Sequence, residues 1–400
     1  MELRNMTLAS LSVDGRGSYG IAASAVDRSD ELYTYLRITD IRDDGTLNMA
    51  DLKSVDDEKA SQYLLKPNDI VFARTGASTG RNYFYDGTDG EFVYAGFLIK
   101  FSIDPVKVNP QFIKYYCMSD AYKGWIHSYN TGSTRGNINA RTLGGMVIPV
   151  PPWQQQDGMV SILSALDAKI KNNIEINENL QQQAAAIFKA WFVDYIPFNG
   201  DAPKEWKNVI LEDITILISR GIAPKYSDNS NQIVINQKCI RHHMIDLSLA
   251  RTHKPKKINE KWLRFGDLLI NSTGTGTLGR TAQVWFQPQN LTVDSHITIV
   301  RPANENLIFY IGLWGIEHEK EIESLHTGST GQTELPRDRV KAMKLACPDI
   351  ETLDRFNAII APMAATIVSN QEENQRLSSL RDVLLPKLMS GEIDVVDIPF

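Results

Sequence analysis

Residues 163–191 read LSALDAKIKNNIEINENLQQQAAAIFKAW, and residues 360–388 read IAPMAATIVSNQEENQRLSSLRDVLLPKL. In the first stretch, apolar or small residues return at alternating steps of three and four, a heptad pattern typical of a helix that packs against another helix. The same register returns in the second stretch at a constant offset of 197 positions (163 to 360 and 191 to 388). We call the residues that follow this pattern the seam: Leu163, Leu166, Ile170, Asn173, Asn177, Leu180 and Ile187, then Ile360, Met363, Ile367, Asn370, Asn374, Leu377 and Leu384.

Each stretch therefore predicts a long helix with a narrow apolar stripe that needs a partner. A first helix from about Met159 to about Asp194 would be ~50 Å long at 1.5 Å per residue. We expect the two helices to pair with each other as an antiparallel coiled coil. The seam asparagines would then lie near its middle and fix the register, whereas the alternative is that they face solvent. Pro362 predicts a kink or a delayed start of the second helix, and Arg381 predicts fraying.

The rest of the chain repeats in outline. Asp69 through Arg81 resembles Asp267 through Arg280, and the run Thr-Gly-Ser-Thr occurs at 131–134 and again at 327–330. Short apolar runs between turn signals indicate strands, and Pro110 opens a predicted helix over 109–122. We predict an α/β (α+β) chain with a pseudo-twofold internal repeat. Its parts are a first globular domain (1–150), a first helix region (151–200), a second globular domain (201–345) and a second helix region (346–400).

Composition narrows the class of protein. A length of 400 residues favours two domains, and no apolar run approaches the ~20 residues that span a bilayer, so we expect no membrane segment and a cytoplasmic location. The three cysteines are isolated in sequence, which predicts neither a zinc site nor a disulfide framework. A formal net charge of −6 is unusual for a protein that binds DNA by itself. Residues 346–400 hold 4 basic against 9 acidic residues, so much of the negative charge falls in a predicted helix.

The chain resembles the specificity subunits of type I restriction-modification systems over essentially its whole length. The resemblance rests on the Thr-Gly-Ser-Thr runs, on IPVPPW at 148–153, on IFKAWF at 187–192 and on LLPKLMSGEI at 384–393. It implies two target-recognition domains that each read one half of a split double-stranded DNA site, with the helices as a spacer. It also implies two DNA-methyltransferase subunits as partners, with or without restriction-translocase subunits. S-adenosylmethionine, and ATP with Mg²⁺ where DNA is cut, would be bound by those partners.

Two loops in each globular domain carry side chains suited to DNA. Arginine suits guanine, asparagine suits adenine, and hydroxyls and lysines suit phosphates. The alternative is that the turns are structural and the lysines only solvate a loop. In the first domain the candidates are Arg74, Thr75, Ser78, Thr79, Arg81, Arg135, Asn137, Asn139 and Arg141. In the second they are Ser272, Thr273, Thr275, Thr277, Arg280, Ser329, Thr330 and Gln332, together with the basic residues Lys254, Lys256 and Lys257.

The sequence contains no recognisable motif of a catalytic site. It has neither the phosphate loop G-x-x-x-x-G-K-[ST] nor the Asn/Asp-Pro-Pro-aromatic motif of adenine methyltransferases. The pair His242-His243, with His253 nearby, has no matching carboxylate or cysteine cluster, so a polar loop is favoured over a metal site. We therefore predict a non-catalytic subunit without a cofactor of its own. The competing hypotheses are a coiled-coil interaction scaffold that does not read DNA and, least favoured, a self-contained modifying enzyme.

Overall fold

A computed structural model describes residues 3–130, 137–274, 276–328 and 333–395. The chain divides into two compact units: unit 1 comprises Met1–Ile170 with Arg376–Phe400, and unit 2 comprises Lys171–Gln375. Each unit therefore combines one globular region with a part of both long helices. Within the described ranges, no helix combines the length and the apolar character that crossing a bilayer requires.

Within its described residues, unit 1 forms three sheets. Strand β1 (Arg4–Thr7) pairs antiparallel with β10 (Val147–Val150). The central sheet has the order β2 (Ser18–Tyr19), β9 (Leu98–Ser102), β6 (Asp69–Ala73), β7 (Asn82–Tyr85). The third sheet has the order β3 (Ala25–Val26), β5 (Lys53–Val55), β4 (Tyr33–Leu36), β8 (Phe92–Tyr94), and its β4 and β8 are parallel. The helices of this unit's globular part are α1 (Pro110–Tyr116), α2 (Asp120–Asn130) and α3 (Ala140–Gly144).

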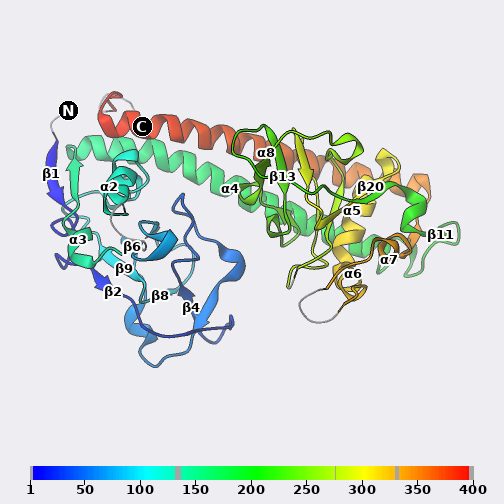
Figure 1. The fold of residues 1–400 in the computed structure, drawn as a ribbon, viewed down its shortest axis with the longest axis horizontal. Helices are drawn as coiled ribbons and strands as arrows, with labels where there is room; N and C mark the ends of the chain where they lie inside the picture. Colours follow the sequence, from blue (N-terminus) through cyan, green and yellow to red (C-terminus); the bar gives the residue numbers. More distant parts are fainter. Residues whose placement is uncertain (1–2, 131–136, 275, 329–332, 396–400) are drawn as a thin grey trace. The chain divides into compact units, whose positions relative to one another are not determined.

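Unit 2 repeats most of this plan. Figure 1 shows the globular regions of both units and the two long helices. Strand β11 (Lys207–Ile210) pairs with β21 (Lys344–Cys347), as β1 does with β10. The central sheet has the order β12 (Thr215–Arg220), β20 (Ile297–Pro302), β17 (Leu268–Asn271), β18 (Thr281–Gln283). The next sheet, β16 (Arg251–His253), β13 (Gln232–Ile235), β19 (Leu291–Val293), keeps a parallel pair in β13 and β19, and β14 (Ile240–Arg241) and β15 (Met244–Ile245) form a hairpin. The remaining helices are α5 (Ile308–Glu317), α6 (Glu319–Ser324) and α7 (Arg337–Lys341). The matching strand orders confirm the predicted fold class and its internal repeat.

The two long helices, α4 (Trp153–Phe192) and α8 (Ile350–Ser390), pair antiparallel. In unit 2, Asn173 Nδ2 donates to Asn374 Oδ1 at 2.9 Å, and Asn370 Nδ2 donates to Asn177 Oδ1 at 2.9 Å. The asparagines therefore contact one another inside the pair. All the seam residues named above are buried or half-buried. The start of α4 at Trp153 is earlier than predicted and directly follows Pro151-Pro152.

The expectation that Pro362 delays the start of the second helix was wrong. The helix begins at Ile350, well before Pro362, and runs without interruption to Ser390. Pro362 is exposed, and Ile360 and Ala364, two residues before and after it, are buried. Burial of this apolar face stabilises the helix across the proline, which lacks an N–H group. The predicted helix over 109–122 was also wrong in detail, because the chain breaks it between α1 and α2. Asn109 does cap α1, and its side chain accepts from the Gln111 N–H at 3.0 Å.

Arg381 does not fray the helix, because it has a partner in unit 1. Its Nη1 lies 3.0 Å from Asp167 Oδ1, and Asp167 Oδ2 also accepts from Lys114 Nζ and from the Tyr115 hydroxyl, both at 2.9 Å. Burial of Asp167 opposes its ionisation, but these three donors more than offset that effect and lower its pKa. The group ties α1 to both long helices.

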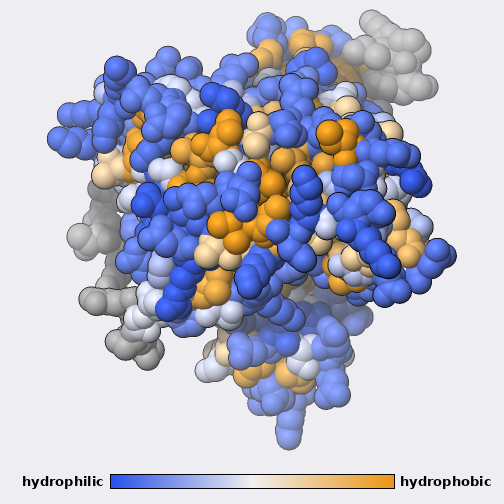
Figure 2. All heavy atoms as spheres, turned by 90° about the vertical axis from the view of Figure 1, so that its right-hand side faces the viewer, coloured by the Kyte–Doolittle hydropathy of each residue, from blue (hydrophilic) through white to orange (hydrophobic). Residues whose placement is uncertain are grey.

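The surface of the chain is mixed. Figure 2 shows hydrophobic residues gathered between hydrophilic ones on the face turned to the viewer. Large apolar side chains of unit 2 that are exposed include Ile196, Ile216 and Ile350. Single exposed apolar residues are common on folded proteins and need no special explanation.

Candidate nucleic-acid interface

In unit 1, the predicted loops meet at one end of the central sheet. Thr75, in the loop after β6, forms an isolated antiparallel bridge with Asn137. The Ile138 N–H donates to the carbonyl of Arg74 at 2.9 Å, and the Arg74 N–H donates to the carbonyl of Phe97 at 3.1 Å. Three segments that are distant in sequence are thus held together by backbone hydrogen bonds.

The side chain of Arg74 is the centre of this cluster. Its guanidinium lies 4.9 Å from the centroid of the Tyr19 ring, and its Nη2 lies 3.4 Å from Asn137 Oδ1. The Tyr19 hydroxyl accepts from the Ala140 N–H at 3.1 Å, which fixes the ring over the guanidinium. Asn139 caps α3 by accepting from the Thr142 N–H at 2.8 Å, and Arg141 is exposed on that helix. Arg74, Thr75, Asn137, Asn139 and Arg141 therefore lie in one region.

Other predicted residues of this unit have structural partners. The buried hydroxyl of Thr79 donates to the Gly76 carbonyl at 2.7 Å and so closes the turn Gly76–Ser78. Arg81 forms a two-pronged ion pair with Asp43, with distances of 2.6 Å from Nε to Oδ1 and 3.1 Å from Nη2 to Oδ2. These two side chains hold the turn in place, whereas Arg74 lies in the cluster beside it.

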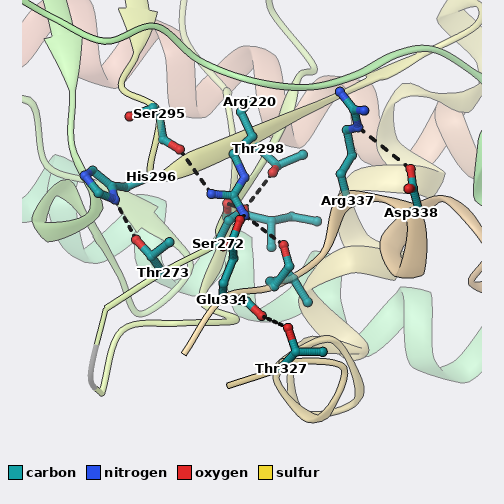
Figure 3. Close-up of polar contacts among 12 residues, drawn as sticks. Arg220, Ser272, Thr273, Ser295, His296, Thr298, Thr327, Glu334, Arg337 and Asp338 are labelled. Atoms are coloured by element: carbon teal, nitrogen blue, oxygen red, sulfur yellow. Dashed lines mark hydrogen bonds and ion pairs between the residues drawn. The ribbon is translucent and has the colours of Figure 1, made fainter. Parts of the chain in front are cut away.

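Unit 2 forms the same junction with different side chains (Figure 3). Thr273 bridges Glu334 as Thr75 bridges Asn137. The Leu335 N–H donates to the Ser272 carbonyl and the Ser272 N–H to the His296 carbonyl, both at 2.8 Å. These hydrogen bonds match those of unit 1 one for one, so Ser272 stands where Arg74 stands in the first unit.

An arginine also lies at the centre of the junction in unit 2, but it comes from another strand. Arg220 ends β12, as Tyr19 ends β2, and each is followed by a glycine. Arg220 Nη2 lies 2.9 Å from both Glu334 Oε1 and the Leu335 carbonyl, and Nη1 donates to the Ser295 carbonyl at 3.3 Å. His296 Nδ1 lies 2.7 Å from Thr273 Oγ1 (Figure 3).

The predicted residues of unit 2 divide between accessible and structural positions. Ser272 is fully buried, and its hydroxyl lies 2.6 Å from Thr298 Oγ1, so it is not accessible to a ligand. Thr277 closes the turn by donating to the Gly274 carbonyl at 3.3 Å, and Arg280 follows the turn half-buried. Lys254, Lys256 and Lys257 are exposed in the segment after β16. Five predicted residues lie outside the described ranges: Arg135, Thr275, Ser329, Thr330 and Gln332.

Several residues of the two junctions were missed by the sequence analysis. They are Tyr19 and Phe97 in unit 1, and Arg220, His296 and Glu334 in unit 2. Each reaches the junction through the pairing of strands that are far apart in the chain. The repeat gave a signal for Glu334, because it occupies the position of the predicted residue Asn137.

The paired histidines form no metal site within the described ranges, which hold no group of three or more His, Cys, Asp or Glu able to bind a metal ion. His242 and His243 instead form the two-residue turn of the β14–β15 hairpin, both with positive φ (49° and 60°). His243 Nδ1 lies 3.4 Å from Glu319 Oε2, and this carboxylate raises the pKa of the imidazole. The same Glu319 oxygen accepts from the Thr281 N–H at 2.7 Å, so the pair fastens the hairpin to β18.

Comparison with known proteins gives a consistent result. The family model described as the type I restriction modification DNA specificity domain matches residues 22–182. The specificity subunit of the type I restriction enzyme MjaIX from Methanocaldococcus jannaschii is 26% identical over 314 residues, which are 72% of this chain and 70% of that protein. The HindI specificity subunit from Haemophilus influenzae is 21% identical over 403 residues, covering 82% of this chain and 87% of the relative. The crystal structure of a type I S subunit from M. genitalium superposes with a TM-score of 0.52 at 16% identity over 96% of each chain, which shows a shared fold.

Proposed function

Because the chain belongs to the family of type I restriction-modification specificity subunits, we propose that each of its globular units reads one half of a split, asymmetric DNA site. One observation carries this proposal. The two units share the strand order of the central sheet and the hydrogen bonds of the loop junction, yet they place different side chains at equivalent positions. A common scaffold with different contact residues suits two half-sites of different sequence.

The proposed role is non-catalytic. The chain lacks the sequence motifs for nucleotide hydrolysis and for adenine methylation, so two DNA-methyltransferase subunits would transfer the methyl group from S-adenosylmethionine. Restriction-translocase subunits, where present, would cut DNA with ATP and Mg²⁺. We place the assembly in the cytoplasm, where its double-stranded DNA target lies.

A second candidate function is a coiled-coil scaffold that never contacts DNA, and the formal net charge of −6 favours it. Mobility-shift titrations of the chain co-purified with its methyltransferase would separate the two functions. For the reader we expect a sequence preference that persists while overall affinity falls steeply with salt, because phosphate contacts release counterions. Equal affinity for all duplexes would support the scaffold.

A further inference from the structure

Asn137 and Glu334 occupy the same place in the two units. Each forms a bridge with a threonine of the preceding loop, Thr75 or Thr273. The residue that follows each donates its N–H to the carbonyl of the residue before that threonine, Arg74 or Ser272. Both residues are exposed, in contrast to Ile138 and Leu335, which follow them and are buried. The backbone thus presents one side chain outward at a fixed position in each unit.

In both units this side chain is held by an arginine. Arg74 reaches Asn137 Oδ1 at 3.4 Å, and Arg220 reaches Glu334 Oε1 at 2.9 Å. Arg74 directly follows β6, whereas Arg220 is the last residue of β12, so the two arginines reach the equivalent side chain from different elements. Arg220 directs donors to two backbone carbonyls as well, and its side chain is 24% exposed, against 62% for that of Glu334. The carboxylate is therefore the more accessible member of the pair.

The hydrogen-bonding capacity of an exposed carboxylate determines which DNA base it can recognise. Ionised Glu334 only accepts hydrogen bonds, and phosphate groups repel it. In the major groove an acceptor-only group suits the exocyclic amino group of cytosine, whereas the carboxamide of Asn137, which donates and accepts, suits adenine. Arg220 offsets the negative charge and fixes the direction of the carboxylate.

We infer that Glu334 determines specificity in the second half-site by accepting a hydrogen bond from a cytosine amino group, and that Asn137 reads adenine from the equivalent position in the first. Arg220 and Arg74 are positioning residues. This inference rests on the proposed function, because it assigns a base contact to each proposed reader.

The first experiment is Glu334→Gln in the complex with the methyltransferase, followed by sequencing of the methylated motif. A carboxamide at this place should change one cytosine of one half-site to adenine and leave the other half unchanged. The matched control is Glu321→Gln, which removes the same charge from an exposed position on α6 and should leave the motif intact. In the reciprocal variant, Asn137→Asp, one adenine of the other half-site should change to cytosine.

The second experiment measures competition binding to duplexes with single-base changes. Glu334→Ala should lower discrimination at one base pair by about 5- to 150-fold, the value of one good base contact, with little change at other positions. Arg220→Ala should lower it at the same base pair, Arg220→Lys should restore part of the loss, and neither should have a further effect in the Glu334→Ala background. A purely structural role of Arg220 predicts additive losses at every base pair.

The outcomes distinguish this inference from the proposed function. A bipartite motif that is unchanged by both Glu334→Gln and Glu334→Ala would overturn the inference and leave the two-reader function standing. Equal loss of discrimination in both half-sites would overturn it as well. Absence of any bipartite motif for the unmodified complex would overturn the proposed function itself.

Discussion

The asparagine layer of the helix pair permits a sharp prediction about stability. Asn173 is fully buried, and its Nδ2 donates to Glu373 Oε2 at 2.7 Å and to Asn374 Oδ1 at 2.9 Å. Its own Oδ1 is buried without a hydrogen-bond partner. A hydrogen bond to a charged group contributes about 1.5–3 kcal/mol and a neutral one about 0.5–1.5 kcal/mol. Asn173→Ala should therefore lower the free energy of unfolding by about 2–4 kcal/mol.

Asn173→Leu should behave differently, although it loses the same two hydrogen bonds. A buried leucine contributes about 1.5–3 kcal/mol by leaving water, and the substitution also removes the unsatisfied oxygen. We expect its stability to be within about 1 kcal/mol of the parent chain. What should be lost is the fixed register, because an apolar seam can slide.

Urea denaturation of Asn173→Ala, Asn173→Leu and the control Asn172→Ala measures these differences. Asn172 is exposed, so its substitution should change stability by no more than about 0.5 kcal/mol. Cross-linking of cysteines placed across the helices reports the register, and in the double variant Asn173→Leu with Asn370→Leu it should become heterogeneous. Equal destabilisation by alanine and leucine, or unchanged cross-linking in the double variant, would contradict the reasoning.

Three further predictions concern unit 2. Because Glu319 raises the pKa of His243, the contribution of this pair to the free energy of unfolding is complete below the ordinary imidazole pKa of about 6.5 and is lost as the pH rises through the raised value. In urea titrations across pH, His243→Gln should abolish this loss of stability. At Gly221 a Cβ would lie 2.0 Å from a backbone carbonyl oxygen, so Gly221→Ala should cost about 3 kcal/mol, and a thermal midpoint equal to that of the parent chain would count against this packing. Asp267 and Arg301 form a buried ion pair with both contacts at 2.7 Å, so Asp267→Ala should cost about 3–5 kcal/mol by calorimetry, whereas a loss below about 1 kcal/mol would mean that the pair is dispensable.

The sequence was most informative where structure follows from local periodicity. A heptad seam predicts which face of each long helix is buried, and the antiparallel pairing of the two copies predicts that the four asparagines lie near the middle of the pair. It was less informative where a side chain has a partner elsewhere in the chain. Fraying at Arg381 was predicted because its partner, Asp167, lies in the other helix.

The junctions show the same division. Arg74 and Asn137 were predicted because each lies in a polar loop with a suggestive composition. Glu334 and Arg220 were missed, since an acidic residue in a candidate DNA-binding loop and an arginine at a strand end become meaningful only when strand pairing brings them within 2.9 Å of each other. Arg81 was singled out by its loop, whereas its partner Asp43 lies in another segment.

The central claim is that each globular unit reads one half of the DNA site. Residues 201–345 can be replaced by the equivalent region of another family member, with both long helices retained, and the methylated motif can then be sequenced from cells that express the complex. The two-reader account predicts that one half of the motif changes while the other half and the spacing between them stay the same. A change in both halves, or in neither, would contradict it.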